Sequence, residues 1–133
     1  MLRRWILAAM ISFAASAAFA QAADVNGLWT DVAGPDFKNG YLVLAQDGDE
    51  IHMAHYLEYK GTPMVEYGRG SSKNGKIVLH VKVSKPIPGW ATAGTHTLQL
   101  SDDGNMLKGE YADSRGNKGP LEFRRVMSAV PAK

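Results

Sequence analysis

The side chains best suited to chemistry in this chain are its four histidines, His52, His55, His80 and His96. His52 and His55 are three residues apart, a spacing that puts both on one face of a helix but on opposite faces of a strand. His80 alternates with lysines, whereas His55 and His96 share the phase of apolar neighbours. We therefore expect His55 and His96 to be hydrogen-bonded interior histidines. This interpretation is favoured over a metal site, because zinc needs three or four converging ligands.

Motifs for catalysis or cofactor binding are not found in the sequence. The chain has no cysteine, no Gly-x-Ser-x-Gly and no His-Glu-x-x-His, and no nucleophile–base pair can be assembled from it. Gly68-Arg69-Gly70 lacks the strand–loop–helix context of a phosphate cradle, so its glycines indicate strand bends. We expect no catalytic residue, no metal and no cofactor.

The rest of the chain alternates short β-like runs with turn dipeptides. Asp-Gly and Asn-Gly between such runs are strong hairpin signals, because both turn positions need positive φ. Within the run after Asn74-Gly75, residues Ile77, Leu79 and Val81 share one face while His80 and Lys82 share the other. One buried and one wet face is typical of antiparallel strands. The predicted strands are residues 26–32, 40–46, 50–59, 62–70, 76–85, 95–101, 105–112 and 119–127.

Eight sequential strands joined mostly by tight turns predict an up-and-down meander. A sheet of this length leaves a costly exposed edge unless it closes on itself. We therefore predict an all-β fold, a single eight-stranded antiparallel barrel over residues 21–133, with an interior that is packed or holds one small ligand. An open curved sheet or a two-sheet sandwich is the alternative.

Two features resemble the calycin superfamily of lipocalins, fatty-acid-binding proteins and avidins. Gly27-Leu28-Trp29 is similar to the Gly-x-Trp that opens the first strand in that group, and Arg125, or else Arg124, lies in the last strand. The resemblance implies a lipocalin- or avidin-like barrel in which Arg125 makes a cation–π contact with Trp29 and closes the barrel floor. The second lipocalin motif, Thr-Asp-Tyr, and the additional avidin tryptophans are absent. The resemblance therefore implies the fold and not the ligand.

Residues 1–20 have the pattern of a cleavable secretory signal. Arg3 and Arg4 precede an uncharged stretch that ends in the cleavage-site pattern Ala18-Phe19-Ala20. This stretch is shorter than the roughly 20 apolar residues of a membrane-spanning helix, so we expect no stable membrane anchor. Loss of the two arginines leaves thirteen of the fifteen basic residues against thirteen acidic ones. We predict a periplasmic or secreted protein that does not bind nucleic acid, because no basic stripe is present.

The loop from Pro86 to Trp90 is the most informative irregular segment. It carries Ile87 and Trp90 between prolines and glycine. Aromatic residues on a rigid loop suit a ligand lid or a partner contact, but Ile87 and Trp90 could equally fold back and plug one end of the barrel. Interior-phase polar side chains suited to contact a ligand are His55, Tyr59, His96 and Tyr111.

These observations leave three hypotheses of function. The first is an exported, lipocalin-like binding protein for a small apolar or amphipathic ligand, contacted by His55, Tyr59, Trp90, His96 and Tyr111. The second is an exported inhibitor or immunity-type protein that contacts a protein partner through Ile87 and Trp90. The third is an enzyme that uses an interior histidine or tyrosine as acid or base. A solvent-open interior of roughly 300 Å³ or more favours the first.

Overall fold

The computed structural model describes residues 24–32 and 37–126, and only the backbone at positions 37 and 38. The predicted signal segment, residues 1–20, lies outside the described residues. The elements are all strands: β1 (Gly27–Asp31), β2 (Phe37–Asp47), β3 (Glu50–Tyr59), β4 (Thr62–Lys73), β5 (Lys76–Val83), β6 (Ala93–Leu100), β7 (Met106–Asp113) and β8 (Lys118–Arg125). The all-β prediction is confirmed for this part of the chain.

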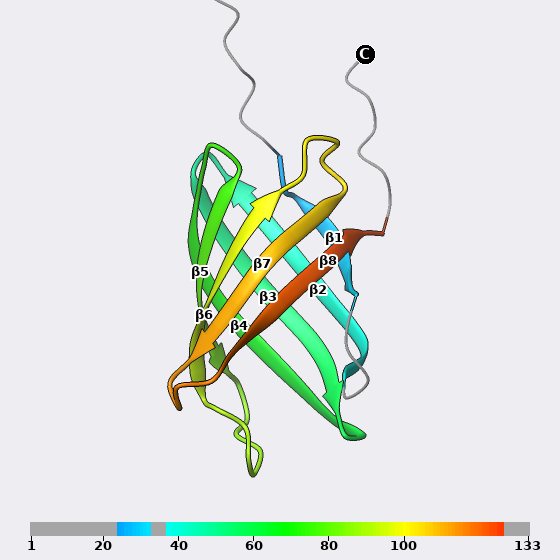
Figure 1. Ribbon diagram of the computed structural model, residues 1–133, viewed down its shortest axis with the longest axis vertical. Coiled ribbons are helices and arrows are strands. Elements are labelled where there is room, and N and C mark those ends of the chain that lie inside the picture. Colours follow the sequence, from blue (N-terminus) through cyan, green and yellow to red (C-terminus); the bar gives the residue numbers. More distant parts are fainter. Residues whose placement is uncertain (1–23, 33–36, 127–133) are drawn as a thin grey trace, which may run out of the picture.

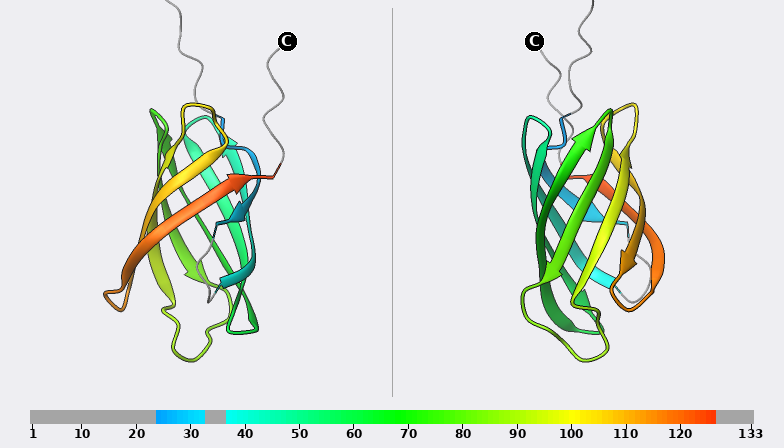
Figure 2. Two further views of the ribbon diagram at one scale, coloured as in Figure 1. Left: turned by 45° about the vertical axis from the view of Figure 1, so that its right-hand side comes forward. Right: turned by 90° about the vertical axis from the view of Figure 1, so that its left-hand side faces the viewer.

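The eight strands form a closed barrel in which each pairs antiparallel with its sequence neighbour and β8 pairs with β1. The strands are tilted against the barrel axis in all three ribbon views (Figure 1, Figure 2). The prediction of a closed up-and-down barrel is confirmed, and the open sheet and the sandwich are excluded. Closure pairs every strand on both sides, which removes the exposed edge.

The turns account for most differences from the predicted strand ends. Lys60-Gly61 and Asn74-Gly75 have positive φ at both positions, as tight hairpin turns require. The β2–β3 turn lies at Gly48 and Asp49, one residue later than expected, because Asp47 still pairs with Glu50. β4 continues through residues 71–73, which were predicted to be a turn, because their pairing with β5 runs up to Asn74-Gly75.

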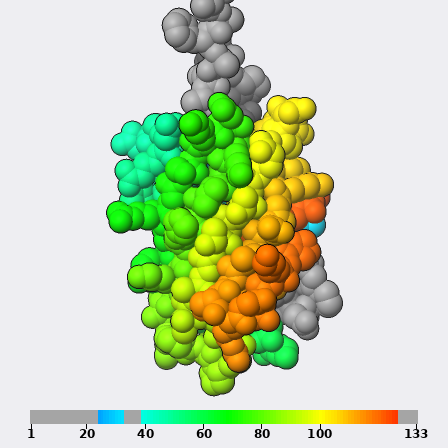
Figure 3. Space-filling model, turned by 60° about the vertical axis from the view of Figure 1, so that its left-hand side comes forward, coloured from blue at the N-terminus to red at the C-terminus, as the bar shows by residue number. Residues whose placement is uncertain are grey.

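The two glycines of Gly68-Arg69-Gly70 allow a close approach of β4 to β5. A Cβ at Gly68 would overlap the carbonyl oxygen of His80, and one at Gly70 would overlap that of Val78. Neither glycine has a positive φ, so the requirement is space and not backbone conformation. Figure 3 shows the outer face of this side of the barrel, where the strands from β4 (green) to β8 (orange) lie side by side.

One end of the barrel is filled by a compact apolar core, and this end is called the closed end below. The interior residues come from alternate positions of the strands, as the period of two predicts. Trp29 and Phe123 are the largest of the fully buried side chains. The core consists of Val25, Trp29, Leu42, Leu44, Ile51, Met53, Ile77, Leu79, Val81, Leu98, Leu107 and Phe123.

Arg125 contacts separate parts of the chain at the closed end. Its guanidinium carbon lies 4.2 Å from the ring centroid of Trp29, which is fully buried. Its N–H groups donate to the carbonyl oxygens of Asp24 at 2.8 Å, Asn26 at 2.7 Å and Gly104 at 3.0 Å. Arg125, and not Arg124, therefore makes the contact that the resemblance implies, and the entering and leaving segments of the chain lie side by side.

Replacing Arg125 by alanine should lower the free energy of unfolding by about 2–4 kcal/mol. The substitution removes three charge-assisted hydrogen bonds and leaves three carbonyl oxygens at the closed end without these donors. Urea denaturation measures the change. Arg124→Ala is the matched control, because Arg124 is exposed on the outer face, and it should cost less than about 0.5 kcal/mol. Equal losses in the two variants would contradict the assigned role.

Candidate functional site

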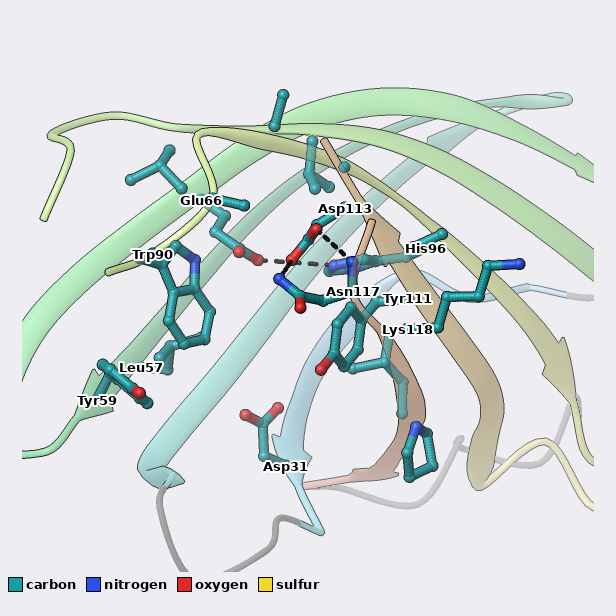
Figure 4. A pocket seen from close by; sticks show the side chains of 18 of the residues that line it. Asp31, Leu57, Tyr59, Glu66, Trp90, His96, Tyr111, Asp113, Asn117 and Lys118 are labelled. Carbon is teal, nitrogen blue, oxygen red and sulfur yellow. Dashed lines mark hydrogen bonds and ion pairs between the residues drawn. The ribbon is translucent and has the colours of Figure 1, made fainter. Parts of the chain in front are cut away.

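A cavity of about 950 Å³ opens at the end of the barrel opposite the core. The β5–β6 loop, the β7–β8 turn and the end of β3 surround its mouth, and these segments lie at the lower end of the barrel in Figure 1. Figure 4 shows the lining side chains from close by. Apolar and aromatic walls come from residues that include Leu57, Tyr59, Val81, Val83, Trp90, Ala91, Tyr111 and Leu121, and two carboxylates, Asp31 and Glu66, project from the strands beneath them.

Four polar side chains form a cluster between the cavity and the apolar core. We call them the carboxylate–histidine cluster: Asp31, His55, Glu66 and His96. Each is almost fully buried, with side-chain exposures of 11 % for Asp31, 9 % for Glu66, 6 % for His96 and 4 % for His55. Buried polar groups are tolerated only where hydrogen bonds replace water. The bonds within the cluster therefore decide what it can do.

His55 is held between two carboxylates. Its Nδ1 lies 3.2 Å from Oε2 of Glu66, and its Nε2 lies 3.0 and 3.1 Å from the two carboxylate oxygens of Asp31. Carboxylates accept hydrogen bonds, and neutral imidazole has only one N–H to donate. Both bonds can therefore form together only when His55 is the doubly protonated imidazolium.

The charge of His55 follows from this geometry. Burial by itself lowers the pKa of His55, but the hydrogen bonds and negative charges of Asp31 and Glu66 outweigh burial and raise the pKa from 6.5 to about 9. Burial raises the pKa of Glu66, yet the hydrogen bond to His55, the charges of both histidines and the indole N–H of Trp90 hold it below its ordinary value. At neutral pH the two residues form a buried ion pair.

The expectation that both interior histidines are hydrogen-bonded is confirmed for His55 but is wrong for His96, which lacks a close partner. Its Nε2 lies 3.8 Å from Oε2 of Glu66, too far for a hydrogen bond, and its Nδ1 has no partner among the described residues. Burial lowers the pKa of His96, and the attraction of Glu66 does not compensate for it. His96 is therefore neutral at pH 7 and offers an imidazole nitrogen as an acceptor.

Local sequence explains how the cluster is positioned. The two-residue turn at Lys60-Gly61 sets the β3–β4 register, in which His55 lies directly opposite Glu66. Asp31 comes from β1 and reaches His55 past Gly40, where a Cβ would overlap the Asp31 carboxylate. The absence of a side chain at Gly40, next to an irregularity in the β2–β3 register, thus makes room for Asp31.

The loop residue Trp90 forms part of the mouth of the cavity. Its ring lies 4.7 Å from that of Tyr59, centroid to centroid, at an interplanar angle of 59°. Both rings line the cavity, and both are only partly exposed. Ile87 in the same loop is also partly exposed but does not line the cavity. Trp90 therefore folds back over the barrel end, which is one of the two alternatives for this loop.

The structure brings most of the predicted site residues together. Tyr59, Trp90, His96 and Tyr111 line the cavity, and His55 lies beneath it, behind Asp31 and Glu66. His52 is exposed and His55 buried, which confirms that they lie on opposite faces. Sequence reasoning missed Asp31 and Glu66. The Lys60-Gly61 hairpin contained the signal for Glu66, since that turn pairs position 55 with position 66.

The surroundings of the cluster do not resemble a metal centre. Across residues 24–32 and 37–126, no group of three or more histidine or acidic side chains has the geometry to hold a metal ion. The two nitrogens of His55 point to different carboxylates, so the ligands do not converge.

Within residues 24–32 and 37–126 there is no helix long and apolar enough to cross a membrane.

Comparisons with known proteins found no matching family model, curated protein or solved structure. The function is therefore argued from the site itself.

The ion pair at His55 predicts how stability depends on pH. Because the folded-state pKa of about 9 lies above the unfolded value of 6.5, the contribution of His55 is complete below pH 6.5 and is lost as pH rises through 9. We expect the free energy of unfolding to fall by roughly 3 kcal/mol across this window, measured by urea denaturation at a series of pH values.

His55→Gln should remove most of this slope, whereas His52→Gln, at an exposed position, should keep it. A wild-type stability that is flat between pH 6.5 and 9 would rule out the charged form of His55. Below pH 6.5 a separate loss is expected, because the lowered pKa values of His96 and Glu66 make their contributions disappear on acidification.

A second prediction concerns Gly40. Gly40→Ala should displace the Asp31 carboxylate and weaken its bond to His55, so that the pKa of His55 falls by at least about 1. NMR titration of the imidazole Cε1–H resonance measures this value directly. Asp31→Asn should shift the pKa in the same direction without crowding β2. A pKa that remains at about 9 in both variants would contradict the role of Asp31.

Proposed function

We propose that this protein is an exported, lipocalin-like binding protein that holds one small amphipathic molecule in the cavity of its barrel. The observation that carries the proposal is the cavity itself, which has about 950 Å³, opens at one end, and is lined by apolar and aromatic residues together with charged and polar ones. Ligand pockets typically measure about 300–1,000 Å³ and combine these two kinds of lining.

The division of the interior supports binding over a purely structural barrel. A barrel that served only as a scaffold would be expected to fill its interior with side chains at both ends. Here the apolar core occupies the closed end, and buried carboxylates and imidazoles lie beneath the cavity at the other. Buried polar groups are costly, and binding sites are where such groups are commonly retained.

The conformation of the β5–β6 loop also supports a ligand over a protein partner. Trp90 lines the cavity, its ring packs at a tilt against that of Tyr59, and its indole N–H helps to lower the pKa of Glu66. An aromatic residue that anchors a partner protein would instead be presented outward. The inhibitor hypothesis would have to rely on Ile87, which is only partly exposed.

The lipocalin-like assignment and the export are parts of the same proposal. The contact of Arg125 with Trp29 at the closed end supports the first. The signal-like pattern of residues 1–20 supports the periplasm or the cell exterior as the location. Recovery of the cleaved protein from a periplasmic extract, with an amino terminus near Gln21, is the corresponding observation.

A matched pair of tryptophan substitutions tests binding. Ala93 lines the cavity near its mouth, whereas Ala54 is exposed on the outer face of β3. We expect N-phenyl-1-naphthylamine, an aromatic dye that is uncharged at neutral pH, to gain fluorescence on binding to the wild-type protein. Ala93→Trp should weaken this binding by about tenfold or more, which corresponds to about 1.4 kcal/mol, and Ala54→Trp should leave it unchanged. Binding that is absent, or equally affected by both variants, would overturn the proposed site.

A further inference from the structure

The carboxylate–histidine cluster gives the cavity floor a negative charge. It contains two carboxylates and one imidazolium, while His96 is neutral. The protein beyond residue 20 has no excess of positive charge to offset it, because this part of the chain contains thirteen basic and thirteen acidic residues. Lys118 lines the cavity near its mouth, but its side chain points away from Asp31 and Glu66 (Figure 4). In a low-dielectric pocket a charge of this kind acts strongly on a ligand.

His96 supplies a second and independent indication. It lines the cavity with its side chain 6 % exposed, and its Nδ1 has no hydrogen-bond partner among residues 24–32 and 37–126. The 3.8 Å separation of Nε2 from Glu66 leaves these two groups without a hydrogen bond to each other. Glu66 and His96 both line the cavity, and a carboxylate and a neutral imidazole can each accept a hydrogen bond from a ligand that brings N–H donors.

The walls above the floor match the other half of such a ligand. Tyr59 and Trp90 present aromatic rings at the mouth, and Leu57, Val81 and Val83 line the sides. An apolar group would lie between these walls with its charged end directed to the floor.

We propose that the ligand is an amphipathic organic cation, a primary amine that carries an aromatic or branched apolar group. Its ammonium group donates hydrogen bonds to Glu66 and to the unprotonated nitrogen of His96, and its apolar part contacts Tyr59 and Trp90. Asp31 adds a second negative charge to the floor. A ligand with a carboxylate or phosphate would instead meet the two buried carboxylates and be repelled. This inference rests on the proposed binding function and specifies the class of molecule bound.

Three ligands with the same naphthyl group test the inference by isothermal titration calorimetry. They are 2-(1-naphthyl)ethylamine, 2-(1-naphthyl)ethanol and 1-naphthylacetic acid, which are cationic, neutral and anionic at pH 7. The amine should bind at least about tenfold more tightly than the alcohol, and the acid more weakly than the alcohol. An alcohol or acid that binds as tightly as the amine would overturn the cation preference and leave the binding function standing.

The same titrations separate failure of the two proposals. If the neutral dye binds and none of the three naphthyl compounds does, the cation preference is overturned. If neither the dye nor any naphthyl compound binds, the binding function fails and the inference fails with it.

Variants that replace a carboxylate by an uncharged amide test which residue causes the preference for the amine over the alcohol. Glu66→Gln should reduce the amine-to-alcohol affinity ratio by about tenfold while the alcohol still binds, which also shows that the barrel is folded. Glu110→Gln, at an exposed position of β7, is the matched control and should keep the ratio. If Glu66→Gln does not fold, Asp31→Asn provides the same readout. An unchanged ratio in the folded variant would remove the floor as the source of selectivity.

Discussion

Pairing of β1 with β8 is the constraint on which the rest of the structure depends. β1 has five residues, and its contact with β8 comprises three residue pairs, of which Trp29 with Arg125 and Asp31 with Phe123 are the outer two. Trp29 and Asp31 lie two positions apart and therefore point to the same side of the strand. One side chain completes the core of the closed end, and the other completes the cluster beneath the cavity. Closure of the barrel and construction of the site are thus achieved by one short strand.

The two ends of the barrel interior bury different kinds of side chain, and each kind is stabilised in a different way. Apolar packing at the closed end gains stability from surface removed from water. At the cavity, the carboxylates lose hydration, and the loss is offset chiefly because His55 donates to both of them. His96 is left outside this arrangement, with one nitrogen unpaired among the described residues. Such a group is costly in a scaffold but useful where a ligand completes the hydrogen bonding.

The barrel could be predicted from sequence because its information is local. Strands with alternating polarity and turns that contain Gly or Asn each depend on a few neighbouring residues. Eight such strands in succession favour closure, because an open sheet of this length would leave exposed edges. The phase of His55 and His96 could be read in the same way. Asp31 could not, because its place beside His55 depends on a pairing between the first and last strands and on the space at Gly40. The size of the cavity depends on how all the side chains pack together, and no single run of residues encodes it.

The hydrogen bond from Arg125 to the carbonyl oxygen of Asp24 has a consequence for the connectivity of the chain. Through the Arg125 side chain it joins the start and the end of the described barrel, on the side away from the cavity. A short linker from position 126 to position 24 would therefore span the gap, and new termini could be opened at an exposed hairpin such as Gly48-Asp49. Because the barrel is closed, the position of the termini decides which strand comes first in the chain. The side chains specify the pairing of neighbouring strands, and this pairing does not depend on where the termini lie. A circularly permuted barrel would keep Trp29 beneath Arg125 and leave the mouth of the cavity unobstructed.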